Sequence, residues 1–175
     1  MAASTLGIAV MGTGFGQKIH IPGFGIHHRT EVKAVYHRDP TQAQEIAAKH
    51  NIPKACSTLA EVWSLPEIDA VSIATPPFLH LEMATQALQA GKHILLEKPT
   101  ALTVEEARQI ETLAQQHQRV ATLDFEFRFV PAWQHFAELL AAGYIGQPRL
   151  IKVDWMVPGR ANSDRAWSWY AEQSK

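Results

Sequence analysis

The sequence has few of the features that mark secreted, metal-binding or nucleic-acid-binding proteins. Its 175 residues include one cysteine, Cys56, which cannot form an intrachain disulfide or a metal site of several thiolates. The formal net charge is −1 and no stripe of Lys and Arg stands out, so nucleic acid is not expected as a partner. Nine histidines occur without a His-Glu-x-x-His pattern, and no metal site is expected.

The sequence also has no long hydrophobic run, and its first residues give no expectation of a leader peptide. The start, Met-Ala-Ala-Ser-Thr, has no basic region, and the apolar run Leu6–Met11 is too short for a signal peptide or a membrane span. We therefore expect a cytoplasmic protein without membrane contact. Hydrophobic residues make up 46% and charged residues 19%, proportions typical of an ordinary globular protein with one complete core.

What is present is a regular alternation of short apolar runs and longer helical stretches. The runs predict strands at Leu6–Met11, Val32–Tyr36, Ala70–Ala74, His93–Leu96 and Val120–Leu123, with a short strand near Lys54–Cys56. Helical spacing predicts helices at Thr41–His50, Leu79–Ala90 and Val104–His117. Such alternation requires right-handed crossovers, so the expected fold class is α/β, a doubly wound and mostly parallel sheet with helices on both faces.

The pattern changes after Asp124. A helix is expected over Pro131–Ala142, where Gly143 would end it, and a strand is expected over Arg149–Val157. We therefore expect two domains: residues 1–124 form the α/β domain, and residues 125–175 form the incomplete beginning of an α+β domain.

A glycine-rich loop follows the first expected strand directly. It reads Gly12-Thr13-Gly14-Phe15-Gly16-Gln17, with the third glycine one place earlier than in the full dinucleotide-binding pattern. Gly12 suits the tight turn, Gly14 allows the backbone to approach a pyrophosphate, and the helix start that follows offers free N–H groups to phosphates. The alternative is an ordinary strand-to-loop turn, in which glycines are also common.

The end of the second expected strand bears on which dinucleotide binds. In dinucleotide folds a carboxylate about 20 residues past the loop bonds the ribose hydroxyls. Here the strand ends in Tyr36-His37-Arg38-Asp39, and His37 and Arg38 can bind a 2′-phosphate through charge-assisted hydrogen bonds. NADP is therefore favoured over NAD. The alternative is that Arg38 is an exposed loop residue and Asp39 a helix cap.

Two further segments follow the fourth and fifth expected strands, where open α/β sheets bind ligands. They are Thr75-Pro76-Pro77-Phe78-Leu79-His80 and Glu97-Lys98-Pro99. The pKa of a lysine moves readily when its amine is partly desolvated, so Lys98 is a candidate acid for a substrate hydroxyl. Taken alone, Glu-Lys-Pro is a common surface tripeptide and is better explained as a capped turn before a helix.

Taken in order, these segments resemble the Gfo/Idh/MocA oxidoreductase family. The motifs that carry the resemblance are the glycine loop with His20-Ile21-Pro22, Thr-Pro-Pro-x-x-His, the segment Ala87–His93 and Glu-Lys-Pro. The resemblance runs to about residue 157. It implies an N-terminal Rossmann domain, followed by a domain with a large open sheet that binds substrate and often builds a homo-oligomer.

The resemblance also implies roles for individual residues. Lys98 would be the family lysine near the substrate hydroxyl, and Glu97 would help to position the nicotinamide. The other cofactor-binding residues would be Gly12, Gly14, Phe15 and Gly16 at the pyrophosphate with Thr13 of the same loop, Thr75, Pro76 and His80 along the dinucleotide, and Arg128 along the cofactor cleft.

The sequence departs from the family pattern at three points. His37 replaces the frequent ribose-binding Asp, and Pro77 stands where many relatives have Asn. The family's downstream Asp and His, which complete the proton-transfer site, have no counterpart before Lys175.

The leading hypothesis is an oxidoreductase that transfers a hydride between NADP, or NAD, and a sugar, cyclitol or related polyol. One alternative is a dinucleotide-binding module without turnover, and another is an interaction domain that has lost its nucleotide.

Overall fold

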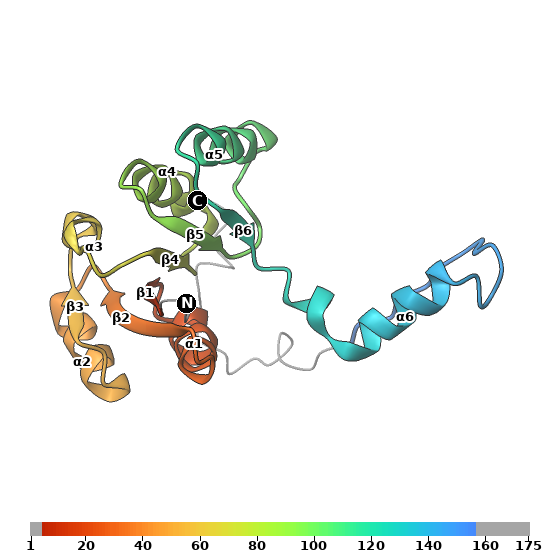
Figure 1. The fold of residues 1–175 in the computed structure, drawn as a ribbon, viewed down its shortest axis with the longest axis horizontal. Helices are drawn as coiled ribbons and strands as arrows, with labels where there is room; N and C mark the ends of the chain where they lie inside the picture. The colour runs from red at the N-terminus through yellow and green to blue at the C-terminus, as the bar shows by residue number, and fades with distance from the viewer. Residues whose placement is uncertain (1–4, 157–175) are drawn as a thin grey trace. The chain divides into compact units, whose positions relative to one another are not determined.

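The computed structural model describes residues 5–156 of the chain (Figure 1). A six-stranded parallel sheet has the order β3-β2-β1-β4-β5-β6. Its strands are β1 (Leu6–Met11), β2 (Thr30–Tyr36), β3 (Lys54–Cys56), β4 (Ala70–Ile73), β5 (His93–Leu96) and β6 (Ala121–Leu123). This order confirms the expected doubly wound Rossmann fold, whose strand order reverses on either side of β1.

Helices connect the strands and cover both faces of the sheet (Figure 1). In the sheet-bearing part they are the π-helical turn η1 (Gly16–His20), α1 (Ile21–Ile26), α2 (Pro40–His50), α3 (Leu59–Ser64), the 3₁₀ turn η2 (Pro77–Leu79), α4 (His80–Gln89) and α5 (Val104–Gln116). The three helices predicted within this part are present as α2, α4 and α5. The short helices α1 and α3 are not among the predicted helix ranges.

Two apolar cores lie on opposite faces of the sheet. Alternate residues of β1 divide between them, because side chains on a strand point to opposite faces. Ala9 and Met11 join the core beneath α3, α4 and α5, whereas Ile8 and Val10 join the core beneath α1 and α2. All four side chains are buried, so β1 is covered on both faces, as expected for the centre of a parallel sheet.

Side chains and turn residues fix the helix ends. The carboxylate of Asp39 accepts hydrogen bonds from the N–H groups of Thr41 and Gln42 at the start of α2. The Thr103 hydroxyl accepts from the N–H of Glu106 at the start of α5. After α4 the chain turns at Gly91, which has a φ of +74°. These ends agree with the helix starts and the helix stop expected from the sequence.

The carboxyl ends of four strands meet along one edge of the sheet. The N–H of Ala74 donates to Met11 O at 2.7 Å, that of Glu97 to Ile73 O at 2.9 Å, and that of Asp124 to Leu96 O at 2.8 Å. The residues that directly follow β1, β4, β5 and β6 are thus held in register by backbone hydrogen bonds. This edge is where open α/β sheets bind their ligands.

The chain divides after Asp124 into two compact units. The second unit contains η3 (Glu126–Phe129) and α6 (Pro131–Ala141), the helix expected there. The strand expected over Arg149–Val157 is wrong for residues 149–156, which form no strand, and Val157 lies outside the described residues. A strand needs a hydrogen-bonded neighbour, and none pairs with this segment within residues 5–156.

Between Thr5 and Met156, no helix combines the length and the apolar character needed to cross a membrane.

Candidate functional site

The first glycine of the loop occupies a position that only glycine fits. Gly12 directly follows β1 and has a φ of +106°, a region that other residues rarely adopt. A Cβ at this position would lie 2.3 Å from the carbonyl oxygen of Ala74 and 2.9 Å from the nitrogen of Thr75. Gly12 therefore allows the loop after β1 to pack directly against the backbone after β4.

The other two glycines have different surroundings. Among the described residues, no atom lies within 4 Å of a Cβ built on Gly14, so its backbone borders open space that a phosphate group can enter. A Cβ on Gly16 would lie 3.1 Å from Val10 Cγ1 and 3.3 Å from Ala74 Cβ, so this glycine allows the following helix to pack closely on the sheet. The three environments match the tight turn, the phosphate approach and the close packing that the dinucleotide fingerprint requires.

The early third glycine coincides with a π-helical turn. The chain winds as η1 over Gly16–His20 before α1 begins at Ile21. A π-helical turn contains more residues than an α-helical turn and is often found at functional sites. His20, the last residue of η1, is 5% exposed and points into the interior.

The His20 ring connects three strands of the sheet. Its Nε2 lies 3.1 Å from Glu97 Oε1 and 3.3 Å from Asp124 Oδ2, and its Nδ1 lies 2.6 Å from the hydroxyl of Ser72 on β4. Glu97 and Asp124 each directly follow a strand, β5 and β6. The glycine-loop helix and the carboxyl ends of β4, β5 and β6 are therefore joined through one side chain.

Glu97 uses its two carboxylate oxygens for different neighbours. Oε1 faces His20, whereas Oε2 accepts the backbone N–H of Lys98 at 3.1 Å and lies 3.8 Å from Lys98 Nζ. Burial raises the pKa of Glu97, but the hydrogen bond from His20 and the charge of Lys98 outweigh burial and leave the pKa below its ordinary value. Glu97 is therefore a carboxylate beside Lys98 at neutral pH.

The amine of Lys98 lies beside the glycine loop. Nζ is 5.6 Å from the centre of the Phe15 ring, close enough for a cation–π contact, and the side chain is 44% exposed. The structure thus brings the predicted residues Gly12, Gly14, Phe15, Glu97 and Lys98 to one edge of the sheet. An amine that is partly exposed and paired with a carboxylate can donate a proton to a ligand or accept one from it.

The residues after β2 lie at the same edge but are arranged differently from a ribose-binding carboxylate. Asp39 caps α2, as the alternative interpretation of the sequence held. The Asp39 N–H also donates to His37 Nδ1 at 3.1 Å, and the side chain of Arg38 is exposed. The acid that follows β2 therefore caps a helix through Oδ1.

The segment after β4 is tied to the segment after β5 by His80. The His80 ring is fully buried; Nε2 lies 2.9 Å from Thr75 O and Nδ1 2.9 Å from Pro99 O. Its side chain is therefore not exposed to a ligand but connects the two loops. Thr75 and Pro76 are partly exposed, and the Thr75 hydroxyl donates to Met83 Sδ at 3.4 Å.

The remaining predicted residues are Thr13 and Arg128. Thr13 lies in the loop between Gly12 and Gly14 and is partly exposed. Arg128 lies on η3 of the second unit, where its N–H donates to Phe125 O at 2.9 Å.

Three residues of the network were not assigned a role from the sequence: His20, Ser72 and Asp124. A usable signal existed for Asp124, because it follows β6 just as Glu97 follows β5. The possible ligand atoms of His20, Glu97 and Asp124 all lie within 4.8 Å of one another. The hydrogen bonds from His20 account for this proximity, and we assign no metal to the cluster.

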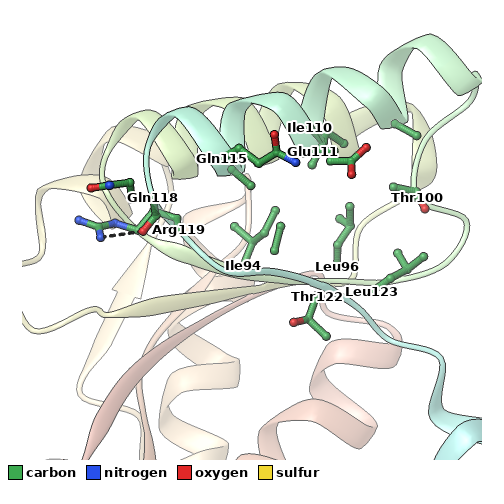
Figure 2. Close-up of a pocket in the computed structure, with 13 residues that line it drawn as sticks. Ile94, Leu96, Thr100, Ile110, Glu111, Gln115, Gln118, Arg119, Thr122 and Leu123 are labelled. Carbon is green, nitrogen blue, oxygen red and sulfur yellow. Dashed lines mark hydrogen bonds between the residues drawn. The ribbon is translucent and has the colours of Figure 1, made fainter.

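A separate cavity of about 400 Å³ lies between α5 and the strands β5 and β6 (Figure 2). Ile94 and Leu96 from β5 and Ile110 from α5 border it, with Glu111 and Gln115 on the helix side. It lies beneath a helix rather than at the carboxyl ends of the strands. We therefore place the candidate dinucleotide site at the glycine loop and not in this cavity.

Known proteins are similar to this chain over the residues that form this edge of the sheet. A family model described as GFO_IDH_MocA, the oxidoreductase family with an NAD-binding Rossmann fold, matches residues 6–125. An uncharacterized oxidoreductase of Synechocystis sp. is 54% identical over 97% of this chain and 46% of its own length. The D-glucoside 3-dehydrogenase of Escherichia coli is 32% identical over 84% of this chain and 42% of its own length.

Among solved structures, this chain is similar to KijD10, a 3-ketoreductase from Actinomadura kijaniata in complex with TDP-benzene and NADP. It superposes with a TM-score of 0.77 at 25% identity, over 82% of this chain and 46% of that one. The chain thus spans less than half the length of each of these relatives.

Proposed function

This chain belongs to the Gfo/Idh/MocA oxidoreductase family, and from that premise we propose that it binds a nicotinamide dinucleotide at the glycine loop and takes part in hydride transfer. The observation that carries the proposal is the contrast among the three glycines. Gly12 and Gly16 are packed against neighbouring atoms, whereas Gly14 borders open space. This combination fits a pyrophosphate that approaches the loop backbone and the start of η1.

Lys98 is the residue that we propose to handle the proton. A bound dinucleotide would supply the hydride acceptor for a substrate carbinol, or the hydride donor in the reverse direction. Oxidation of a carbinol also releases the hydroxyl proton, which a neutral amine accepts and a charged amine returns in the reverse direction. Glu97 lies beside this amine and, as a carboxylate, stabilises its charged form.

We propose that NADP is preferred over NAD. Asp39 Oδ1 accepts the N–H groups that begin α2, so this carboxylate is partly committed to the helix start. Arg38 is exposed beside it and supplies a positive charge that suits a 2′-phosphate. KijD10, a similar protein, is described with NADP, which supports this preference.

The proposed substrate is a sugar, a cyclitol or a related hydroxy compound. The support comes from the family and from a relative that is named a D-glucoside 3-dehydrogenase. Which compound of this class is bound depends on the residues that contact the substrate.

A calorimetric titration with NADPH and with NADH tests the binding proposal. We expect NADPH to bind at least about tenfold more tightly, a difference of about 1.4 kcal/mol. Arg38→Asp should reverse the order, because it replaces an attractive charge with a repulsive one. Arg29→Asp is the matched control, because Arg29 is exposed but precedes β2 at the opposite edge of the sheet.

Two results would count against these proposals. Equal affinities that Arg38→Asp leaves unchanged would remove the NADP preference, and no binding of either dinucleotide would remove the function itself. The alternative function, a module that binds without turnover, predicts normal titrations but no reduction of NADP⁺ when glucosides and cyclitols are supplied. Where the unmodified chain does reduce NADP⁺, Lys98→Ala tests the role of Lys98, since it should abolish turnover and leave binding largely intact.

A further inference from the structure

His20 is a buried polar side chain for which the proposed reaction gives no role. Its ring makes T-shaped contacts with the rings of Phe15 and Phe24, with centroids 5.4 and 6.4 Å away and interplanar angles of 83° and 90°. These contacts fix the plane of the ring and direct one nitrogen toward the carboxylates and the other toward Ser72. The titratable groups that meet here come from three segments: His20 from η1, Glu97 and Lys98 from the end of β5, and Asp124 from the end of β6.

The partners of the two ring nitrogens indicate which one carries the proton. A carboxylate oxygen only accepts, so Nε2 must donate to Glu97, and Asp124 Oδ2 lies 3.3 Å from the same nitrogen. The Ser72 hydroxyl is fully buried, and among residues 5–156 its one hydrogen-bond partner is His20 Nδ1. A buried hydroxyl needs an acceptor for its proton, and Nδ1 provides one. The geometry therefore places a proton on Nε2.

This proton determines which way the Glu97 carboxylate faces. Because Oε1 is held by His20, Oε2 is directed toward the backbone N–H and the amine of Lys98. The Nε2–H group of His20 also lies within reach of Asp124. It therefore separates the carboxylates of Glu97 and Asp124, which would otherwise repel each other.

We propose that His20 is a positioning residue, which holds the Glu97 carboxylate through Nε2–H and thereby keeps that carboxylate ionised and directed at Lys98. The proposal rests on the role of Lys98 proposed above and extends it to a residue that need not touch the substrate or the dinucleotide. The lowered pKa of Glu97 supports it, because the hydrogen bond from His20 is the largest influence that opposes burial.

The test compares two substitutions of His20 that differ in hydrogen bonding. In His20→Gln the side-chain NH₂ occupies about the position of Nε2 and can still donate to Glu97. In His20→Leu the volume is largely kept, but the donor is lost. The titration of the Glu97 carboxyl carbon is followed by ¹³C NMR without cofactor or substrate, and the signal is identified by its loss in Glu97→Gln.

We expect the Glu97 midpoint to rise by about one pH unit or more in His20→Leu, since a buried carboxylate then loses a donor and faces Asp124. In His20→Gln it should stay close to that of the unmodified protein. Equal shifts in both variants, or no shift in either, would overturn the proposal, because a purely packing role does not distinguish donor from non-donor. Where turnover is measured, the acid limb of the kcat/KM profile should move to higher pH in His20→Leu only.

A measurement on the unmodified protein does not depend on how well the variants fold. Long-range ¹H–¹⁵N correlation spectra of labelled histidines report which ring nitrogen is protonated. Nε2–H with unprotonated Nδ1 supports the proposal, and the opposite tautomer overturns it, since it offers the carboxylates no donor. A failure of Lys98→Ala to affect turnover would remove the proposed reaction but would leave both NMR results as they stand.

Discussion

At the scale of single residues, Gly12 and Gly14 provide a matched pair. Gly12→Ala should lower the free energy of unfolding by about 2 kcal/mol or more, because its positive φ and the carbonyl of Ala74 leave no place for a Cβ. Gly14→Ala should change stability by less than about 0.5 kcal/mol, the usual range for surface substitutions. It should nevertheless weaken dinucleotide binding about tenfold or more, because the new methyl group enters the space proposed for the pyrophosphate.

Urea denaturation and calorimetric titration of both glycine variants check this prediction. Unimpaired binding by Gly14→Ala would show that the dinucleotide does not approach the loop at this point. A stable Gly12→Ala would show that the contact between the loop and the backbone after β4 can relax.

Cys56 gives a pH-dependent prediction. Burial is the main cause that raises the pKa of its thiol, and the charge of Glu61 adds to the effect. A group with a raised folded pKa contributes stability that is complete below its unfolded pKa, about 8.5, and is lost as the pH rises through the folded pKa. The free energy of unfolding should therefore fall above about pH 8.5, and this fall should be smaller in Cys56→Ala. Parallel pH dependence of both proteins between pH 7 and 10 would contradict the assignment.

The residues of the candidate site differ in how far the sequence could predict them. The glycines and Lys98 follow strands that their apolar runs reveal, so their common edge could be expected. His20 could not be placed in the same way, because its partners Ser72 and Glu97 are 52 and 77 residues away in the chain. His80 was predicted along the dinucleotide, but its ring is buried between two loops, a position that only the path of the backbone determines.

At the scale of elements, α3 is held by its N-terminal cap. The Thr58 hydroxyl accepts the N–H of Glu61, and the Glu61 carboxylate accepts the N–H groups of Ser57 and Thr58 in return. Thr58→Ala should cost about 1 kcal/mol, the usual contribution of such a cap. Thr112→Ala is the control, because the Thr112 hydroxyl donates to Arg108 O within α5 and caps no helix end. Similar losses in both variants, measured by thermal unfolding, would show that the cap is not the cause.

Helices and strands were predictable to the extent that their own residues determine them. The strands of the sheet are short buried runs, and α2, α4 and α5 are long enough for helical periodicity to show. By contrast, α1 and α3 have six residues each, and α1 contains a proline and two glycines, so periodicity gives little signal. The strand expected over Arg149–Val157 failed for a different reason, since pairing depends on a neighbour and not on the apolar pattern alone.

At the scale of the whole molecule, the site residues are distributed over distant parts of the sequence but share one sheet edge. The glycine loop follows β1, the loop of Thr75 follows β4, and Glu97 and Asp124 follow β5 and β6. The two cores on either face of the sheet hold these strands in register. Stability of the sheet and geometry of the site are therefore linked, and a core substitution under β4 or β5 should affect both.

The contacts described above for His20 and Glu97 lie within the unit that ends at Asp124, which leads to a prediction about residues 1–126 alone. Such a polypeptide keeps every hydrogen bond described for His20 and Glu97, and it keeps Asp124 away from the chain terminus. We expect it to unfold cooperatively and to bind NADPH within about threefold of the 175-residue chain, a difference below 1 kcal/mol. It also lacks the exposed apolar side chains of Phe129, Trp155 and Met156, so it should associate less. Cooperative unfolding with a large loss of affinity would contradict this prediction and show that residues beyond 126 are needed for binding.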